Sequence, residues 1–308
     1  MSFSTEVKNE LFQMIPKARH CRIAELAAAI RFVGEVSVDP AGNRISIQTE
    51  HVTLAKKYYT MLKRTFSGNV MLNIRGQAGA GKMHQYKIQV RDKNMVQELL
   101  SCVMLEDDVR FRNEILHKDC CRRAFIRGAF MASGSMSNPG KSYHFEIVCR
   151  HETQADNLCR LIRQYGIGAK IIQRKNRFVV YVKESEGIID ALNVMEAHKA
   201  SMELENVRII KDMRNSANRQ YNCDAANINK MVQAASKQLE DIRLIQEQIG
   251  LEHIPAQLAQ MALVRMEYPD VSLQELGNYL DPPVGKSGVN HRLRKIAAIA
   301  EELRAEQA

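Results

Sequence analysis

Apolar residues recur along the first two thirds of the chain with two different spacings. Spacings of three and four predict helices at about 20–33, 51–66, 92–101, 120–133, 151–165 and 184–196. Alternation of apolar and polar residues predicts strands at 44–49, 69–74, 84–90, 143–149, 169–174 and 177–182. The mixture indicates an α+β domain.

The same order of elements occurs twice, at an offset of 100 residues. Residues 50–55 align with 150–155, and Gly34 aligns with Gly134. Two units of helix, strand, helix, hairpin and helix, at about 20–105 and 120–200, therefore predict a pseudo-two-fold α+β domain over residues 1–212.

The remaining third of the chain has a different, helical pattern. Residues 213–224 are polar, and we interpret them as an inter-domain linker. A long helix is expected from about 225 to 249, with Gly250 as its C-terminal stop and with Ile228, Val232, Ala235, Leu239, Ile242, Gln246 and Ile249 at heptad spacing. Such a seam either forms a dimer or packs on the helix's own domain, and the sequence leaves the oligomeric state open.

Two short helices near the C-terminus have the spacing of a helix-turn-helix. Ser272 and Glu275 form a capping-box pattern, and 281–285 cannot continue the first helix. From Lys286 onward, one buried face is formed by Val289, Leu293, Ile296 and Ala300. We therefore predict an all-α domain over 225–308, with a helix-turn-helix at 272–301.

Charge is distributed unevenly. The net charge is +9; residues 1–224 hold 35 Lys and Arg against 24 Asp and Glu, and 225–308 hold 9 against 11. Within the acidic last third, 282–300 contain four bases and no acid. This balance favours an anionic partner, and double-stranded DNA is the partner expected for a helix-turn-helix.

The second helix of this motif carries polar and basic side chains opposite its apolar face. Recognition helices contact base edges from their N-terminal half, so Ser287, Asn290, His291 and Arg294 are predicted to read bases. Lys286, Arg292 and Lys295 are predicted to contact phosphates, which fix register without specifying sequence. The alternative is a solvated basic helix in a small bundle.

The predicted sheets carry cations that could neutralise phosphates. These candidates for an N-terminal DNA face are Arg75, Lys82, Lys87, Arg91, Arg174, Lys175 and Arg177. A solvated basic surface that binds nothing explains them equally well.

Residues 76–83 match the G-x-x-x-x-G-K part of a phosphate-binding loop. Met83 replaces the Ser or Thr that would hold Mg²⁺, and the following residues alternate like a strand. A helix N-terminus that could bind phosphate is therefore not expected there. We interpret the segment as a glycine-rich hairpin loop whose Lys82 is available to a nucleic-acid backbone.

Seven cysteines are scattered along the chain without a C-x-x-C pair, which excludes a standard zinc finger and is typical of reduced thiols. His117 with Cys120 and Cys121, and Cys149 with His151, are the near-clusters. Since no matching second pair accompanies them, we expect buried thiols, no metal and no cofactor.

No apolar run approaches the roughly 18–20 residues that span a bilayer, and the first residues lack a hydrophobic signal core. We therefore expect no membrane partner and a cytoplasmic, nucleoid-associated protein.

The first helix of each repeat, 26–34 and 126–134, is rich in small residues and closes on Gly. Here the sequence resembles the LAGLIDADG homing endonucleases, in which two such helices pack on the pseudo-dyad and two sheets lie on DNA. In that family the residue before the final Gly is a metal-holding acid. Val33 and Ser133 occupy these positions here, with Glu35 two residues beyond Val33, so neither offers the carboxylate that metal-assisted hydrolysis needs. The resemblance with this departure predicts a non-enzymatic domain.

The full chain resembles the WhiA family of DNA-binding regulators of Gram-positive bacteria. The resemblance rests on the order of domains, on 222–227 at the start of the long helix, and on 273–277 and 286–293 in the helix-turn-helix. It implies a sequence-specific transcriptional regulator that acts in cell division, chromosome segregation or sporulation.

Two other functions remain open. The first is a metal-dependent DNA endonuclease, and the second is a nucleoid-associated adaptor that binds protein partners through its N-terminal domain. The sequence names neither the target site nor a partner such as RNA polymerase or another regulator.

Overall fold

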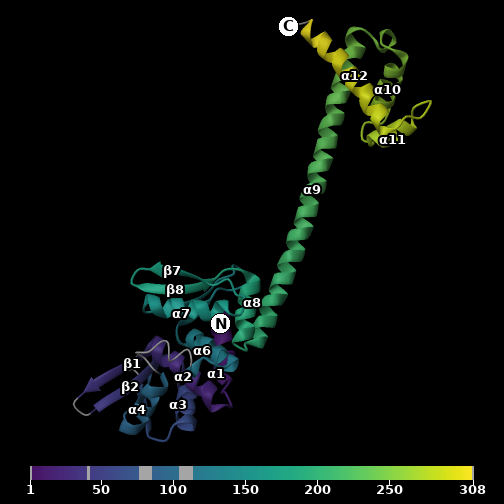
Figure 1. Ribbon diagram of the computed structural model, residues 1–308. Coiled ribbons are helices and arrows are strands. Elements are labelled where there is room, and N and C mark those ends of the chain that lie inside the picture. The colour runs from purple at the N-terminus through teal and green to yellow at the C-terminus, as the bar shows by residue number, and fades with distance from the viewer. Residues whose placement is uncertain (1, 40–41, 76–84, 104–113, 307–308) are drawn as a thin grey trace. The chain divides into compact units, whose positions relative to one another are not determined.

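The computed structural model describes residues 2–39, 42–75, 85–103 and 114–306 (Figure 1). The contacts divide the chain into two units, Met1–Lys211 and Asp212–Ala308. The division lies within one residue of the end predicted for the first domain. Each unit has its own hydrophobic core.

Unit 1 contains two repeats of the same order, preceded by helix α1 (Phe3–Gln13). The first repeat comprises α2 (Arg19–Val33), β1 (Gly34–Asp39), β2 (Gly42–Thr49), α3 (Val52–Thr65), β3 (Val70–Arg75), β4 (Gln85–Val90) and α4 (Lys93–Val103). The second comprises α6 (Asp119–Ser133), β5 (Gly134–Met136), β6 (Phe145–Cys149), α7 (Glu152–Arg163), β7 (Lys170–Arg174), β8 (Arg177–Val182) and α8 (Ser185–Val194). The predicted pseudo-two-fold α+β fold is confirmed.

Each repeat builds one antiparallel four-stranded sheet, in the order β1-β2-β4-β3 and β5-β6-β8-β7. Strands β1 and β5 and helix α1 were not predicted from the sequence. The two strands begin at the glycines that end α2 and α6, so no turn residues separate helix from strand. Each repeat thus has two hairpins where a single strand and one hairpin were predicted.

Helices α2 and α6 lie against each other at the centre of unit 1. Ala27, Ala28 and Ala29 are fully buried. A Cβ atom added to Gly128 would lie 2.7 Å from the Glu25 carbonyl oxygen and 2.8 Å from the Ala28 Cβ. The small residues therefore allow close approach of the two helix backbones.

A buried charged cluster joins the two repeats beside this helix pair. One Glu25 oxygen lies 2.6 Å from Lys57 Nζ, and the other lies 2.9 Å from Arg127 Nε. Arg127 also contacts Glu196, at 2.8 Å. Burial lowers the pKa of Lys57, and the neighbouring Glu25 carboxylate opposes this shift. Buried charges need such pairing because unpaired ions are costly to desolvate.

Residues 213–224, predicted to be a linker before the long helix, are themselves part of that helix. Helix α9 runs without interruption over His198–Gln248, so the helix expected from 225 begins in unit 1. No Gly or Pro occurs between Gly187 and Gly250. The polar composition therefore describes a solvent-exposed helix rather than a break, because nothing in the sequence stops the helix.

Unit 2 adds the short helix η2 (Leu251–His253), α10 (Ala256–Glu267), α11 (Leu273–Asn278) and α12 (Lys286–Ala305) to the second part of α9. The heptad seam of α9 divides in two. Ile242 is fully buried in the core of unit 2, whereas Ile228 and Val232 are exposed. Its C-terminal part therefore packs on its own domain.

Candidate nucleic-acid interface

Helix α12 has the two faces that the sequence predicts. Val289, Leu293, Ile296 and Ala300 are buried in the core of unit 2. On the opposite side, Ser287, His291 and Arg294 are exposed and Asn290 is half-buried. The four predicted base-reading residues thus share one accessible face of a single helix, the arrangement that direct readout in a major groove requires.

The three cations predicted to contact phosphates differ in environment. Lys286 and Lys295 are exposed, whereas Arg292 is half-buried. The Nη1 atom of Arg292 is buried and makes no hydrogen bond with the described residues. Lys286 and Lys295 are therefore free to reach phosphates, while Arg292 is held closer to the protein.

A tight contact between the connection and α11 positions α12. The Val284 N–H donates to the Gly277 carbonyl oxygen at 2.9 Å. A Cβ on Gly277 would overlap the Val284 carbonyl oxygen, so a larger residue does not fit without movement. A Cβ on Gly288 would overlap the Val284 side chain. Two glycines thus hold the connection against both helices.

The start of α11 carries the predicted capping box. The Glu275 N–H donates to Ser272 Oγ at 3.3 Å, and the Ser272 N–H donates to the Glu275 carboxylate at 2.9 Å. The hydrogen bonds from Ser272 lower the pKa of Glu275. These bonds satisfy N–H groups at the helix start and fix where α11 begins.

In the first repeat, the outer face of the sheet is mostly polar. Ile45, Ile47, Ile88 and Val90 point into the core, so alternation places the neighbouring residues on the opposite face. Lys87 lies there, flanked by register partners Gln48 and Asn73. The same face carries Glu35, Ser37, Arg44 and the exposed apolar Met71, together with Ser46 and Gln89, which are buried. Amide and guanidinium groups of this kind can bond to bases and phosphates.

Arg44 belongs to this face and was not among the predicted residues. Its Nε donates to Ser37 Oγ across the β1–β2 pair, at 2.7 Å. The alternation of Arg44 with buried Ile45 and Ile47 was the available signal. Lys87, in turn, lies 3.7 Å from a Glu35 oxygen.

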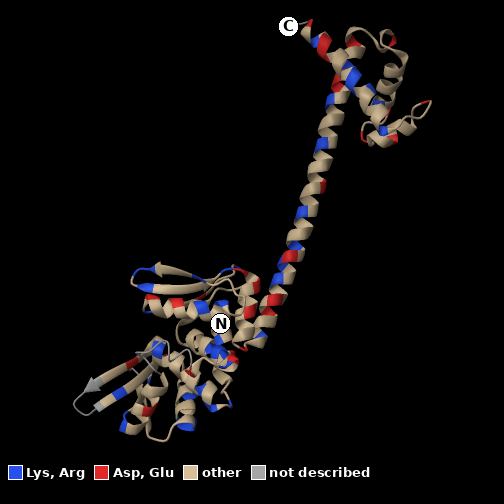
Figure 2. Ribbon diagram, in the orientation of Figure 1, with Lys and Arg blue, Asp and Glu red and all other residues tan. Residues whose placement is uncertain are grey.

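In the second repeat, cations gather at the end of the β7–β8 hairpin, marked blue in Figure 2. Arg174 and Arg177 are direct cross-strand partners, and both are exposed, as is Lys175 between them. Arg174 also pairs with Glu146, at 2.9 Å. Like charges directly opposite destabilise a strand pair, so an anion bound at this end would relieve their repulsion.

The remaining predicted cations lie at strand ends or outside the described residues. Arg91 follows β4 and donates to the Gln89 side chain at 3.3 Å. Arg75 ends β3 opposite Gln85 in the register. Lys82 and the glycine-rich motif at 76–83 lie outside the described residues.

The two positions that hold acids in LAGLIDADG enzymes offer no metal ligand with a negative charge. Val33 is half-buried, and the Ser133 hydroxyl donates to the Val148 carbonyl oxygen at 2.8 Å. The acids that follow are engaged elsewhere: Glu35 with Lys87, and Glu146 with Ser135, His144 and Arg174. Metal-assisted hydrolysis needs carboxylates directed at a shared cation.

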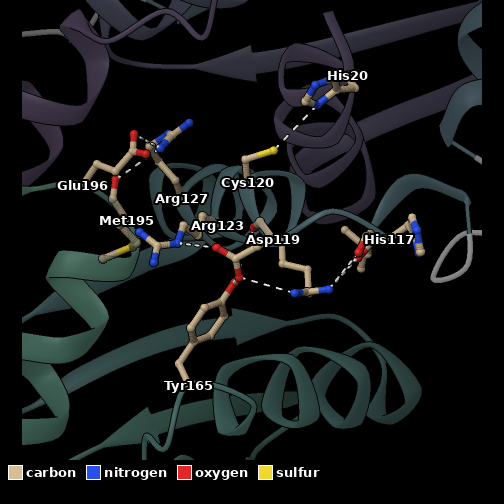
Figure 3. Close-up of polar contacts among 11 residues, drawn as sticks. His20, His117, Asp119, Cys120, Arg123, Arg127, Tyr165, Met195 and Glu196 are labelled. Carbon is tan, nitrogen blue, oxygen red and sulfur yellow. Dashed lines mark hydrogen bonds and ion pairs between the residues drawn. The ribbon is translucent and has the colours of Figure 1, made fainter. Parts of the chain in front are cut away.

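The expectation that no second pair of ligands would join Cys120 and Cys121 is wrong. His20 and Cys21 lie beside them, and the four ligand atoms are all within 4.8 Å of one another. Figure 3 shows His20 and Cys120 directed toward each other. The 100-residue offset aligns 20–21 with 120–121, but the alignment by itself does not place the two helix starts together. The predicted partner His117 is not among these four ligands. Its carbonyl oxygen accepts a hydrogen bond from Arg122 of α6, at 2.9 Å.

None of the helices in the described part of the chain is long and apolar enough to cross a membrane.

Three family models match consecutive parts of the chain. The WhiA N-terminal LAGLIDADG-like domain matches residues 19–105, the WhiA LAGLIDADG-like domain matches 122–214, and the WhiA C-terminal HTH domain matches 217–300. The matches follow the two repeats and the helical unit in order.

Relatives and a solved structure cover nearly the whole chain. Proteins of Lachnoclostridium phytofermentans and Lachnospira eligens, each named "Probable cell division protein WhiA", are 46% identical over 99% of this chain, which matches 100% and 98% of their lengths. The crystal structure of full-length DUF199/WhiA from "Thermatoga maritima" is similar with a TM-score of 0.61 and 25% identity, covering 98% of this chain and 99% of that one.

Proposed function

The chain belongs to the WhiA family, and we propose from this that it is a sequence-specific DNA-binding transcriptional regulator with a part in cell division. The observation that carries the proposal is the accessible polar face of α12. There Ser287, Asn290, His291 and Arg294 lie opposite a buried apolar face. Relatives named as cell division proteins support the process in which the regulator acts.

The mechanism follows from the chemistry of this face. Arg294 can form paired hydrogen bonds to guanine, and Asn290 can form them to adenine. Ser287 and His291 add contacts to neighbouring base edges. Lys286 and Lys295, on the flanks of the same helix, anchor it to the phosphates.

Unit 1 supplies a second, less specific contact with DNA in this proposal. The outer sheet face around Lys87 and the hairpin end at Arg174 and Arg177 would neutralise phosphates. Their contribution increases affinity without selecting sequence, so the target site is set by α12.

No chemistry on DNA is part of the proposal. Val33 and Ser133 cannot hold a divalent cation as carboxylates do, and Glu35 and Glu146 are each paired with a cation. The domain would therefore retain the LAGLIDADG-like fold as a binding platform rather than as a nuclease.

The experiment that tests the proposal is selection of bound fragments from the genome with the full-length protein at one stated salt concentration. An Asn290→Ala, Arg294→Ala double variant serves as the comparison, and Glu301→Ala on the same helix is the control. We expect one enriched motif for the wild type and for Glu301→Ala, and loss of that motif for the double variant. No enriched motif from the wild type would contradict sequence-specific recognition.

A further inference from the structure

Four metal-binding side chains meet where helices α2 and α6 begin. His20 and Cys21 occupy the second and third positions of α2, and Cys120 and Cys121 occupy the same positions of α6. His20 Nδ1 lies 3.2 Å from Cys121 Sγ, 3.3 Å from Cys21 Sγ and 3.9 Å from Cys120 Sγ. Each repeat therefore contributes two ligands at one point.

We propose that His20, Cys21, Cys120 and Cys121 form a structural zinc site that joins the two repeats. In a tetrahedral Zn²⁺ site, bond lengths near 2.3 Å to sulfur and 2.0 Å to nitrogen place a sulfur and a nitrogen about 3.5 Å apart. The three distances between His20 Nδ1 and the sulfurs, 3.2–3.9 Å, bracket this value. Only small side-chain adjustments are needed to hold the ion.

The donor set selects the type of metal. Three thiolates and one imidazole suit Zn²⁺, whereas Mg²⁺, Ca²⁺ and Mn²⁺ prefer oxygen ligands. Four protein ligands complete the tetrahedron and leave no position for a substrate or an activated water, which is typical of a structural site. The site thus stabilises the fold and performs no chemistry.

The surroundings hold the ligands in place and leave a route for the ion. Cys21 and Cys121 are buried, while His20 and Cys120 are exposed. The wall behind the buried thiols is apolar and small, formed by Ala18, Ala24, Ile115 and Ala124. An ion can therefore enter from the exposed side and be shielded on the other.

The residue after each buried cysteine fixes the start of its helix in the same way. Arg22 donates to the carbonyl oxygens of Pro16 and Lys17, and Arg122 donates to those of Leu116 and His117. These acceptors lie six and five residues before each arginine in both repeats. The backbone that carries Cys21 and Cys121 is therefore preorganised by a device repeated across the pseudo-dyad.

Proton release would accompany the binding of zinc. Burial, together with the neighbouring thiols, raises the pKa of Cys21 to about 12, and burial raises the pKa of Cys121. These thiols are protonated at neutral pH without a metal, and zinc must displace their protons. The affinity for zinc should fall as the pH is lowered.

The test uses the full-length protein, prepared metal-free under reducing conditions and titrated with Zn²⁺ and then with Co²⁺. We expect about one ion per chain, and Co²⁺ should give thiolate charge-transfer and tetrahedral d–d absorption. Cys120→Ser and His20→Ala change exposed residues and should retain the fold, as checked by circular dichroism. Each should weaken zinc binding by at least about 10–100-fold, the loss that changes to outer-shell partners alone cause, while Cys223→Ser, an exposed thiol on α9, should bind as the wild type does.

Thermal melting gives a second readout. At a zinc concentration that loads the wild type but not Cys120→Ser, a chelator should lower the Tm of the wild type and of Cys223→Ser but leave that of Cys120→Ser unchanged. Equal zinc affinity in the wild type and Cys120→Ser would overturn the proposal. So would a freshly reduced wild type that binds no zinc and forms a disulfide within the cluster, which would identify a redox pair instead.

Discussion

Arg127 of α6 and Glu25 of α2 form an ion pair between the two repeats, with Arg127 Nε 2.9 Å from a Glu25 oxygen and both side chains buried. The pair has no counterpart at the equivalent positions, where Ala27 and Phe125 stand. The pseudo-symmetry of the helix pair is therefore broken by one charged contact, which specifies how α2 and α6 lie against each other.

Arg127→Met should be strongly destabilising. After the substitution, Lys57 is the remaining cation in contact with Glu25 among the described residues. The buried Glu25 carboxylate is then less well compensated for its loss of hydration. Removing one partner of a buried ion pair costs about 3–5 kcal/mol. Urea denaturation of the full-length protein, followed by circular dichroism, measures the decrease in the free energy of unfolding.

Arg123→Met is the matched control for this prediction. Arg123 lies on the same helix and pairs with Asp119 at 2.9 Å, but both side chains are substantially exposed. Surface ion pairs contribute about 0–1 kcal/mol. Equal losses of stability in the two variants would contradict the importance assigned to the buried pair.

Gly277→Ala should loosen the helix-turn-helix. The new methyl group would overlap the Val284 carbonyl oxygen, so the connection before α12 must move. Overpacking of this kind costs about 1–3 kcal/mol. Hydrogen exchange in the full-length protein should show lower protection over 273–300, with unchanged protection in unit 1.

Gly285→Ala tests whether any change in this connection has the same effect. A Cβ at Gly285 meets no atom within 4 Å, and Gly285 is the N-cap of α12. Replacing a glycine N-cap by alanine costs about 0.5–1 kcal/mol, so a smaller effect than that of Gly277→Ala is expected. If Gly285→Ala reduced protection as much as Gly277→Ala, close packing at Gly277 would not be the cause.

Sequence periodicity predicted the strand hairpins of unit 1 closely because their alternation is regular. The expected strand at 177–182 coincides with β8, and the expected helix at 20–33 differs from α2 by one residue at its start. Strand β1 does alternate, with Val36 and Val38 between polar residues, but it and β5 were missed. They continue directly from a helix, and β5 has three residues, too few for alternation to be recognised.

Composition was misleading where a polar segment is helical. Residues 213–224 contain many polar side chains, which indicated a linker, yet they belong to α9. The thiol cluster was missed for another reason. The repeat aligns Cys21 with Cys121, but alignment alone does not reveal that the pseudo-dyad brings the two helix starts together.

The full-length protein should not cleave DNA. With Val33 and Ser133 at the positions of the catalytic acids, a divalent cation has no pair of carboxylates to bind. A plasmid-nicking assay with Mg²⁺ or Mn²⁺ should show no cleavage above that of buffer. Metal-dependent nicking by the wild type that disappears in purified Glu35→Gln protein would contradict this prediction and restore the nuclease hypothesis.

The hairpin end of the second sheet should contribute to the salt dependence of DNA binding. Each phosphate that the protein no longer neutralises should reduce the slope of log affinity against log salt concentration by about 0.9. We therefore expect a shallower slope for Lys175→Ala, Arg177→Ala protein, measured by fluorescence anisotropy. Lys56→Ala, exposed on α3, is the control and should leave the slope unchanged. Identical slopes for the wild type and both variants would remove this hairpin from the DNA interface.

Two neighbouring cations of α12 should differ in what they do to specificity. Arg294 lies among the predicted base-reading residues, so Arg294→Ala should cost about 1–3 kcal/mol on the selected site and relax its base preference. Lys295 lies on the flank of this face, and Lys295→Ala should weaken binding to all sequences alike, because phosphates carry no sequence information. Competition of the selected site against random DNA, at one salt concentration, separates the two effects. A uniform loss from Arg294→Ala, or a changed base preference from Lys295→Ala, would mean that α12 is rotated in the groove relative to the orientation inferred from its buried face.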